Sequence, residues 1–202
     1  MNVGFISLGC SKNLIDTETT IGIFKENNYK IVNNEKDADI IVINTCGFID
    51  SAKEEAINTI LEMAEYKKKR CKYLIVMGCL VQRYYDELVK LLPEVDLFIK
   101  IDEYDDLWEK INNLIKKDIV EETKTKTSHK ITQIPKMPMF LQEQFMNRTI
   151  TTGSNFAYLK IGEGCSNKCT NGPLIYGIAQ YVHIVQSHIL EDHLLAEKKK
   201  IL

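Results

Sequence analysis

The fold is decided by residues 40–77, in which two short apolar runs flank a helical pattern. The runs read Ile40-Ile-Val-Ile-Asn44 and Tyr73-Leu-Ile-Val-Met77, and their Ile and Val content is typical of buried strands. Residues 50–69 between them predict an amphipathic helix, with Ser51 and Glu54 at capping-box spacing at its start. One face of this helix carries Ala52, Ala56, Ile57, Ile60, Leu61 and Ala64. Two strands joined by such a helix pair in parallel through a right-handed crossover.

The same alternation of strand and helix continues on both sides of this segment. The sequence predicts strands over residues 3–8, 29–32 and 95–99, and helices over residues 14–27, 81–92 and 104–116. This order favours an α/β fold, and we predict an open doubly wound parallel sheet of about five strands for residues 1–117. Trp108 is expected in the core beside the last helix, and Lys67–Lys72 in a solvated turn.

Composition excludes several classes of protein. The 202 residues are 45% hydrophobic and 27% charged, and the net charge of −2 gives no direct signal for nucleic-acid binding. The apolar runs are far shorter than the roughly 18 residues that a membrane span needs. The N-terminus shows no basic region or cleavage site, so we expect a cytoplasmic protein without a membrane partner. Disulfides are rare in that compartment, which makes the six cysteines candidates for ligands, redox groups or core residues.

The remaining chain divides into two parts. Residues 118–151 contain Pro135 and Pro138 and no sustained period, which predicts a linker with one short apolar docking segment over residues 139–146. A new strand is expected over residues 156–161, so a second domain would occupy residues 152–202. That length is too short for a large domain to close its own core.

Three cysteines follow three of the predicted strands. Cys10, Cys46 and Cys79 would therefore share the carboxyl edge of the sheet, and Gly9, Gly47 and Gly78 lie next to them. Three thiolates there would suit an iron–sulfur cluster with one iron left open, or a zinc ion lacking a fourth protein ligand. They would equally suit buried structural thiols, because the spacings of 36 and 33 residues match no local metal motif.

Further cysteines lie elsewhere in the chain. Cys71 precedes a strand and would lie at the opposite edge in a solvated loop, where a ligand role is not expected. Cys165 and Cys169 lie four residues apart in Gly-Glu-Gly-Cys-Ser-Asn-Lys-Cys, which resembles part of a cluster-binding loop. A third thiolate would be needed there to hold three irons of a 4Fe–4S cluster.

Several motifs carry a resemblance to a known family. Residues 7–18 read Ser-Leu-Gly-Cys-Ser-Lys-Asn-Leu-Ile-Asp-Thr-Glu, residues 44–55 read Asn-Thr-Cys-Gly-Phe-Ile-Asp-Ser-Ala-Lys-Glu-Glu, and residues 78–84 read Gly-Cys-Leu-Val-Gln-Arg-Tyr. With residues 158–165, Tyr-Leu-Lys-Ile-Gly-Glu-Gly-Cys, they resemble the methylthiotransferase family of radical S-adenosylmethionine enzymes. The detail is similar to the RimO branch, which modifies small-subunit ribosomal protein twelve, more than to the tRNA-modifying branches. The resemblance covers about residues 1–170.

The resemblance implies a fold and a reaction. It implies that Cys10, Cys46 and Cys79 bind an auxiliary 4Fe–4S cluster, and that a radical S-adenosylmethionine barrel with a second cluster follows. It also implies that a methylthio group is placed on an aspartate side chain of the ribosomal protein. One S-adenosylmethionine would be cleaved to a radical, a second would supply the methyl group, and the open iron of the auxiliary cluster would carry the sulfur.

The sequence departs from the family pattern after Thr170. The family loop has a third cysteine where this chain has Gly172, so the Cys165 and Cys169 site is incomplete. The chain ends at Leu202, before most of the barrel, and we assign no role to its three regularly spaced histidines, His183, His188 and His193. We expect a frameshift near Thr170, a truncated start of the radical domain, and no activity of this chain alone.

Alternatives to the enzyme remain open. One is a non-catalytic module that binds a single auxiliary cluster, and another is a tRNA methylthiotransferase. A flavodoxin-like domain with incidental cysteines is disfavoured, because no phosphate-binding Gly-rich loop follows the first strand. Near the cysteines, Lys12, Asn13, Gln82 and Arg83 would either line the cluster edge or cap and solvate helix starts.

Overall fold

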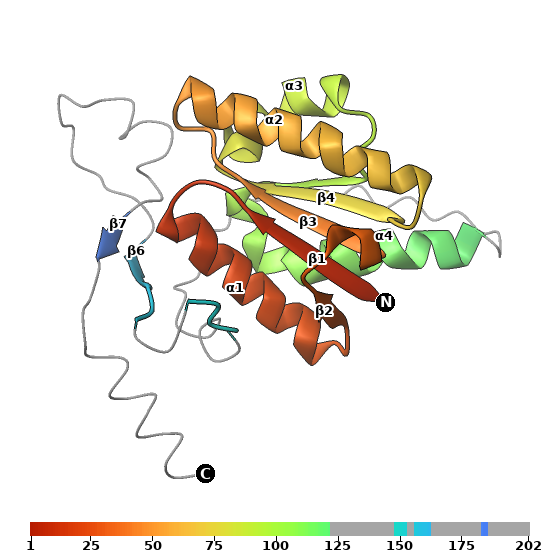
Figure 1. Ribbon diagram of the computed structural model, residues 1–202, viewed down its shortest axis with the longest axis horizontal. Coiled ribbons are helices and arrows are strands. Elements are labelled where there is room, and N and C mark those ends of the chain that lie inside the picture. Colours follow the sequence, from red (N-terminus) through yellow and green to blue (C-terminus); the bar gives the residue numbers. More distant parts are fainter. Residues whose placement is uncertain (122–147, 153–155, 163–182, 186–202) are drawn as a thin grey trace, which may run out of the picture.

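A five-stranded parallel sheet forms the centre of the protein (Figure 1). The computed structural model describes residues 1–121, 148–152, 156–162 and 183–185. The sheet has the order β2-β1-β3-β4-β5, with neighbouring strands parallel throughout. Its strands are β1 (Asn2–Ser7), β2 (Lys30–Val32), β3 (Ile40–Thr45), β4 (Tyr73–Gly78) and β5 (Leu97–Ile99). This is the flavodoxin-like order of doubly wound sheets, and it confirms the predicted fold class.

Helices cover both faces of the sheet and make a three-layer structure (Figure 1). Helices α2 (Asp50–Ala64) and α3 (Cys79–Leu91) pack on one face, and α1 (Ser11–Glu26) and α4 (Leu107–Glu121) on the other. Short 3-10 helices, η1 (Glu35–Asp37), η2 (Glu65–Lys68) and η3 (Ile101–Asp106), connect these elements. The winding changes direction between β1 and β3, because the chain turns to opposite sides after each of them.

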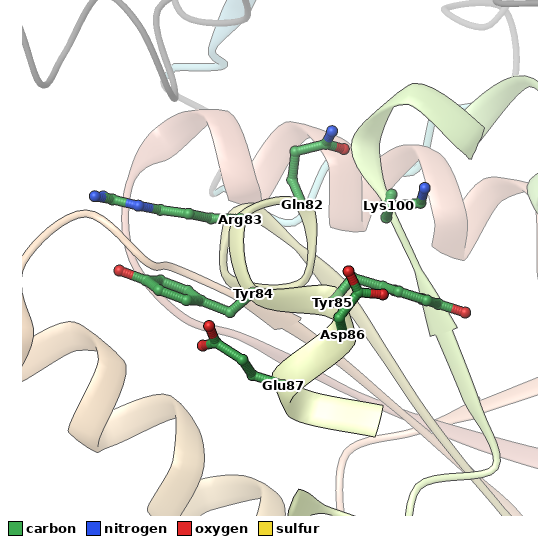
Figure 2. A pocket seen from close by; sticks show the side chains of 7 residues that line it. All are labelled: Gln82, Arg83, Tyr84, Tyr85, Asp86, Glu87 and Lys100. Carbon is green, nitrogen blue, oxygen red and sulfur yellow. The ribbon is translucent and has the colours of Figure 1, made fainter. Parts of the chain in front are cut away.

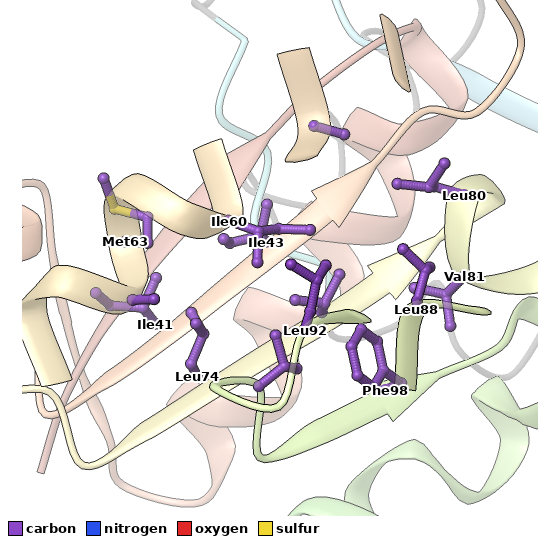
Figure 3. Close-up of a cluster of buried hydrophobic side chains, with 14 of the residues drawn as sticks. Ile41, Ile43, Ile60, Met63, Leu74, Leu80, Val81, Leu88, Leu92 and Phe98 are labelled. Carbon is purple, nitrogen blue, oxygen red and sulfur yellow. The ribbon is translucent and has the colours of Figure 1, made fainter. Parts of the chain in front are cut away.

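Alternating side chains of the central strands build two separate cores. Ile41 and Ile43 of β3 point into the core beneath α2 and α3 (Figure 3), whereas Ile40 and Val42 pack beneath α1 and α4. All six residues of β3 are buried, and so are all six of β4. This explains why both read as continuous apolar runs, which is the pattern of strands covered on both faces.

Trp108 closes the second core, as the sequence predicted. Its ring packs edge-to-face on Phe24, with centroids 5.7 Å apart, and on Tyr29 at 5.9 Å. Phe24 is fully buried between these rings and Phe5. Such aromatic pairs add to the stability that burial of their area supplies.

Two predictions about helix α2 were wrong. Ile49 precedes its first residue, no side chain caps this end, and so the Ser51–Glu54 capping box does not form. Ile57 and Leu61 are exposed, because the face that packs on the sheet is made by Ala56, Ile60, Met63 and Ala64.

The prediction for Cys71 was also wrong in part. Cys71 lies at the amino edge as expected, but its side chain is only 4% exposed and belongs to the first core. Its thiol lies 3.3 Å from the Tyr73 carbonyl oxygen, and burial raises its pKa. The basic neighbours that suggested a solvated loop turn outward instead, and Lys67 contacts Asp96 across the loop at 2.5 Å.

A second, small sheet lies beside helix α1. Strands β6 (Leu159–Gly162) and β7 (His183–Val185) pair in antiparallel fashion, and β6 contacts α1. Strand β6 begins three residues later than the strand predicted over residues 156–161. Among the described residues, no helix is both long and apolar enough to span a membrane. The division of the chain at residues 117 and 151 stays a prediction.

Candidate functional site

Cys10, Cys46 and Cys79 lie at the carboxyl edge of the sheet, where the loops after β1, β3 and β4 meet. The first two flank the point between β1 and β3 at which the winding reverses, and open α/β sheets bind ligands in the crevice at this point. Cys10 is exposed, Cys46 is half-buried and Cys79 is 7% exposed. The group therefore extends from the surface into the core.

Asn13 lies at the centre of this cysteine edge. Its Oδ1 atom is 3.4 Å from the Cys10 Sγ and 3.9 Å from the Cys79 Sγ, although these cysteines are far apart in sequence. The side-chain amide of Asn13 donates to the Thr45 carbonyl oxygen at 2.9 Å, directly before Cys46. One buried side chain thus connects all three cysteine-bearing loops.

A hydrogen-bond network beneath the cysteines fixes these loops. The Asn44 amide donates to the Asn13 carbonyl oxygen at 2.7 Å, and the Thr45 hydroxyl donates to the Met77 carbonyl oxygen at 2.7 Å. Thr17 donates to the same Asn13 carbonyl at 2.8 Å. Asn44 and Thr45 were not among the predicted site residues. A signal was present, because two polar residues end an otherwise apolar strand.

Glycines let the cysteine loops approach closely. A Cβ atom on Gly9 would lie 2.5 Å from the Cβ and 3.1 Å from the Sγ of Cys46, and one on Gly47 would lie 2.8 Å from the Leu80 Cα. Gly78 has φ +105° and packs on the Thr45 backbone, where a side chain would collide. The backbone can therefore pass close to the cysteine side chains only because these three residues have no side chain.

Three helices begin at the cysteine edge and direct their N-termini toward it. Cys10 and Gly78 are the N-cap residues of α1 and α3, and α2 begins three residues after Gly47. None of these three helix starts has a side-chain cap. The partial positive charge of each helix N-terminus favours thiolates and other anions at this edge.

Burial opposes ionisation of the innermost cysteine. Removal from water raises the pKa of the Cys79 thiol to about 11, and the nearby positive charge of Lys12 acts in the opposite direction. Lys12 and Asn13 are each 1% exposed, so the alternative that they solvate the start of the helix was wrong. Helix α1 also begins three residues earlier than predicted, which turns both side chains inward.

Tyr104, which was not among the predicted site residues, also faces this interior. Its hydroxyl is buried and has no hydrogen-bond partner among the residues that the structure describes, and burial, followed by the negative charge of Asp16, raises its pKa. It belongs to η3, which follows β5 in the sequence. No local pattern around Tyr104 distinguishes it from an ordinary residue of a helix start.

The chemistry of these donors fits a sulfur-ligated group. The edge offers three cysteine side chains, closely packed loops and three helix N-termini. As the side chains stand, no three Cys, His, Asp or Glu groups in the described part of the chain are placed to hold a single metal ion. The role of Cys10, Cys46 and Cys79 as ligands therefore stays a prediction. Cys165, Cys169 and Gly172 lie outside the described residues.

Gln82 and Arg83 lie in a separate surface pocket of 270 Å³ at a kink in α3 (Figure 2). Tyr84 departs from helical geometry there, with φ −126° and ψ 27°. Arg83 and Tyr84 extend from one side of the helix, and Arg83 lies over the Tyr84 ring at 5.3 Å. Gln82 accepts a hydrogen bond from the Asp102 amide at 3.3 Å. None of these contacts involves a cysteine.

Sequence comparisons place the three cysteines within a region that matches known proteins. Residues 2–100 match the family described as uncharacterized protein family UPF0004, a range that contains all three cysteines. The chain is 59% identical over 170 residues to the ribosomal protein uS12 methylthiotransferase RimO of Alkaliphilus oremlandii. By sequence, the chain is therefore similar to a part of the RimO proteins.

Other RimO proteins show the same extent of similarity. The RimO proteins of Acetivibrio thermocellus and Caldicellulosiruptor saccharolyticus are 48% and 49% identical to this chain over 171 and 179 residues. These matches cover 83% to 88% of this chain but only 35% to 38% of the relatives, the A. oremlandii protein included. The chain thus spans about a third of the length of the RimO proteins it matches.

Proposed function

We propose that residues 1–117 form the cluster-binding domain of a ribosomal protein uS12 methylthiotransferase, with Cys10, Cys46 and Cys79 as ligands of an auxiliary 4Fe–4S cluster. The observation that carries this proposal is the meeting of three cysteine-bearing loops around Asn13. The high identity to RimO proteins supports it. When bound, the cluster would supply an open iron that accepts the sulfur to be transferred.

The residues of this chain would prepare the edge for such a cluster. Asn13 would hold the Cys10 and Cys79 side chains on one side of the crevice. Lys12 and the three helix N-termini would offset the negative charge of the thiolates. Because Cys10 is exposed and Cys79 is buried, one side of the group would face outward, where a substrate can reach it.

Iron reconstitution tests this assignment. Anaerobic incubation with iron and sulfide should load about four irons per chain at the cysteine edge. The Cys46→Ala variant should lose that iron, whereas Cys71→Ala should keep it, because Cys71 is buried at the opposite edge of the same sheet. Iron content that is unchanged in Cys46→Ala, or lost equally in Cys71→Ala, would contradict the proposed ligand set.

The partner of the whole enzyme follows from the relatives. These relatives are named ribosomal protein uS12 methylthiotransferases, and we infer the same partner, or the ribosome, for the full enzyme in the cytoplasm. Phe48 and Ile49, which are 41% and 53% exposed directly after the Cys46 loop, offer apolar contact area for it.

A second candidate function is a module that binds one cluster and performs no radical chemistry. Gly172 favours this alternative, because the loop that begins with Cys165 and Cys169 then has two thiolates where the family has three. We infer that S-adenosylmethionine is not cleaved at this loop, even if residues 152–202 begin the radical domain.

A further inference from the structure

Glu18 is a fully buried carboxylate whose partners all come from a distant part of the chain. It lies on α1 and is 0% exposed. Its Oε2 accepts a hydrogen bond from Arg148 Nε at 2.8 Å, and Arg148 Nη2 lies 2.6 Å from the same oxygen. Its Oε1 accepts from the Thr151 amide at 2.5 Å and from the Thr151 hydroxyl at 2.7 Å. Both oxygens are therefore satisfied by residues 148–151.

The Glu18 carboxylate needs these partners, because burying an unpaired carboxylate costs free energy of folding. The hydrogen bonds and the ion pair that the Glu18 carboxylate makes with the described residues come from Arg148 and Thr151. The Arg148 side chain is only 6% exposed, so the pair is shielded from water. Removing one member of such a pair leaves an uncompensated buried charge.

Backbone contacts extend the attachment beyond the charged pair. The Thr149 amide donates to the Glu18 carbonyl oxygen at 3.1 Å. Arg148 Nη1 donates to the Tyr158 carbonyl oxygen at 2.6 Å, which fixes the chain directly before β6. Strand β6 in turn contacts α1. The attachment therefore involves residues 148–151 and the Tyr158 backbone directly before β6.

We propose that Glu18 is an internal docking site that anchors residues 148–152, and through Arg148 the Tyr158 backbone, on helix α1. Through this contact the chain that follows residues 122–147 returns to the first domain at a fixed place. The contacts of Glu18 carry this inference, and it stands whether or not the cysteine edge binds a cluster.

Trypsin provides a direct test, because cleavage after Arg148 requires the Arg148 side chain to leave its buried site. In the full chain, Glu18→Gln should accelerate cleavage of the Arg148–Thr149 bond by about tenfold or more, measured by mass spectrometry of the products. Glu26→Gln is the matched control, because Glu26 is an exposed residue at the end of the same helix. Its cleavage rate should equal that of the unchanged protein, and equal rates for all three proteins would overturn the proposal.

A second variant covers the case in which Glu18→Gln does not fold. Arg148→Gln removes the partner from the docked segment and leaves the sheet unaltered. Hydrogen exchange of residues 149–152 and 156–158 should then be faster by about tenfold or more, and by a larger factor than exchange of residues 73–78 of β4, which responds only to the loss of global stability. Unchanged exchange in residues 149–152 and 156–158, or an equal rise there and in β4, would overturn the proposal.

Discussion

At the scale of single residues, the three edge cysteines differ in accessibility although they lie in adjoining loops. Cys10 is exposed, whereas Cys79 is buried beside Asn13 and its pKa is raised to about 11 by burial. A thiol with this pKa is about one-thousandth thiolate at pH 8, against about one quarter for a free cysteine. Because the thiolate is the nucleophile in alkylation, an exposed cysteine and a buried cysteine of this edge should react at different rates.

We therefore predict that alkylation of the iron-free protein at pH 8 is ordered. Cys10 should react with iodoacetamide at least about a hundredfold faster than Cys79, since exposure and ionisation both disfavour Cys79. Peptide mapping by mass spectrometry after timed quenching measures both rates. The difference should disappear in urea, and equal rates in the folded protein would show that Cys79 is not buried in solution.

At the scale of elements, Asp39 ties two strands together at the amino edge of the sheet. Its Oδ2 accepts from the Asn2 amide at 2.7 Å, and its Oδ1 accepts from Arg70 Nε at 3.1 Å. Its carbonyl oxygen accepts from the Lys72 amide, directly before β4. Burial raises the pKa of this carboxyl, but the Asn2 amide and the Arg70 charge outweigh it, so the pKa is lowered.

Asp39→Asn should lower the free energy of unfolding by about 1 kcal/mol at neutral pH, because it weakens charge-assisted bonds at a partly exposed site. A lowered folded pKa means that the unfolded chain binds more protons in acid. The contribution of Asp39 is therefore complete above the unfolded pKa near 4 and is lost as the pH falls through the folded value.

Urea titrations at several pH values measure this effect. The exposed Asp37 provides the control variant Asp37→Asn, which should change stability little. A penalty for Asp39→Asn that persisted undiminished at acid pH would show that its charge is not the stabilising feature.

The order and type of the elements in residues 1–121 could be predicted, because periodicity alone separates strands from helices in this region. The apolar runs of β3 and β4 are buried on both faces and needed no other information. The burial of Lys12 and Cys71 could not be predicted, because it depends on elements that are distant in sequence. The same holds for Tyr104, which reaches the site only through the packing of η3.

The placement of the three cysteines at one edge could also be predicted from the sequence. In a parallel sheet, every strand ends at the same edge, so strand positions alone bring Cys10, Cys46 and Cys79 together. Asn13, which lies between Cys10 and Cys79, could not be assigned its position, because its contacts come from the packing of α1 on β3.

At the scale of the whole molecule, the two groups of cysteines differ in the number of thiols that each contains. The sheet edge has the three thiols that the proposed cluster needs, whereas the sequence that contains Cys165 and Cys169 has Gly172 where the third cysteine is expected. We predict that the reconstituted chain does not cleave S-adenosylmethionine above background, which detection of 5′-deoxyadenosine by chromatography would measure. Gly172→Cys is the informative variant, because it restores the third thiol. Cleavage by the unchanged chain would contradict the prediction.

The Glu18 contact makes the first folding unit discontinuous in sequence. Residues 1–121 supply the layers, but residues 148–151 supply the counter-charge for a carboxylate inside them. A protein cut between these parts would retain every strand of the five-stranded sheet. It would also keep Glu18 buried on helix α1 without the residues that pair with its charge. A cut within residues 122–147 should therefore lower the free energy of unfolding of residues 1–121, because it separates Glu18 from the residues that pair with its charge.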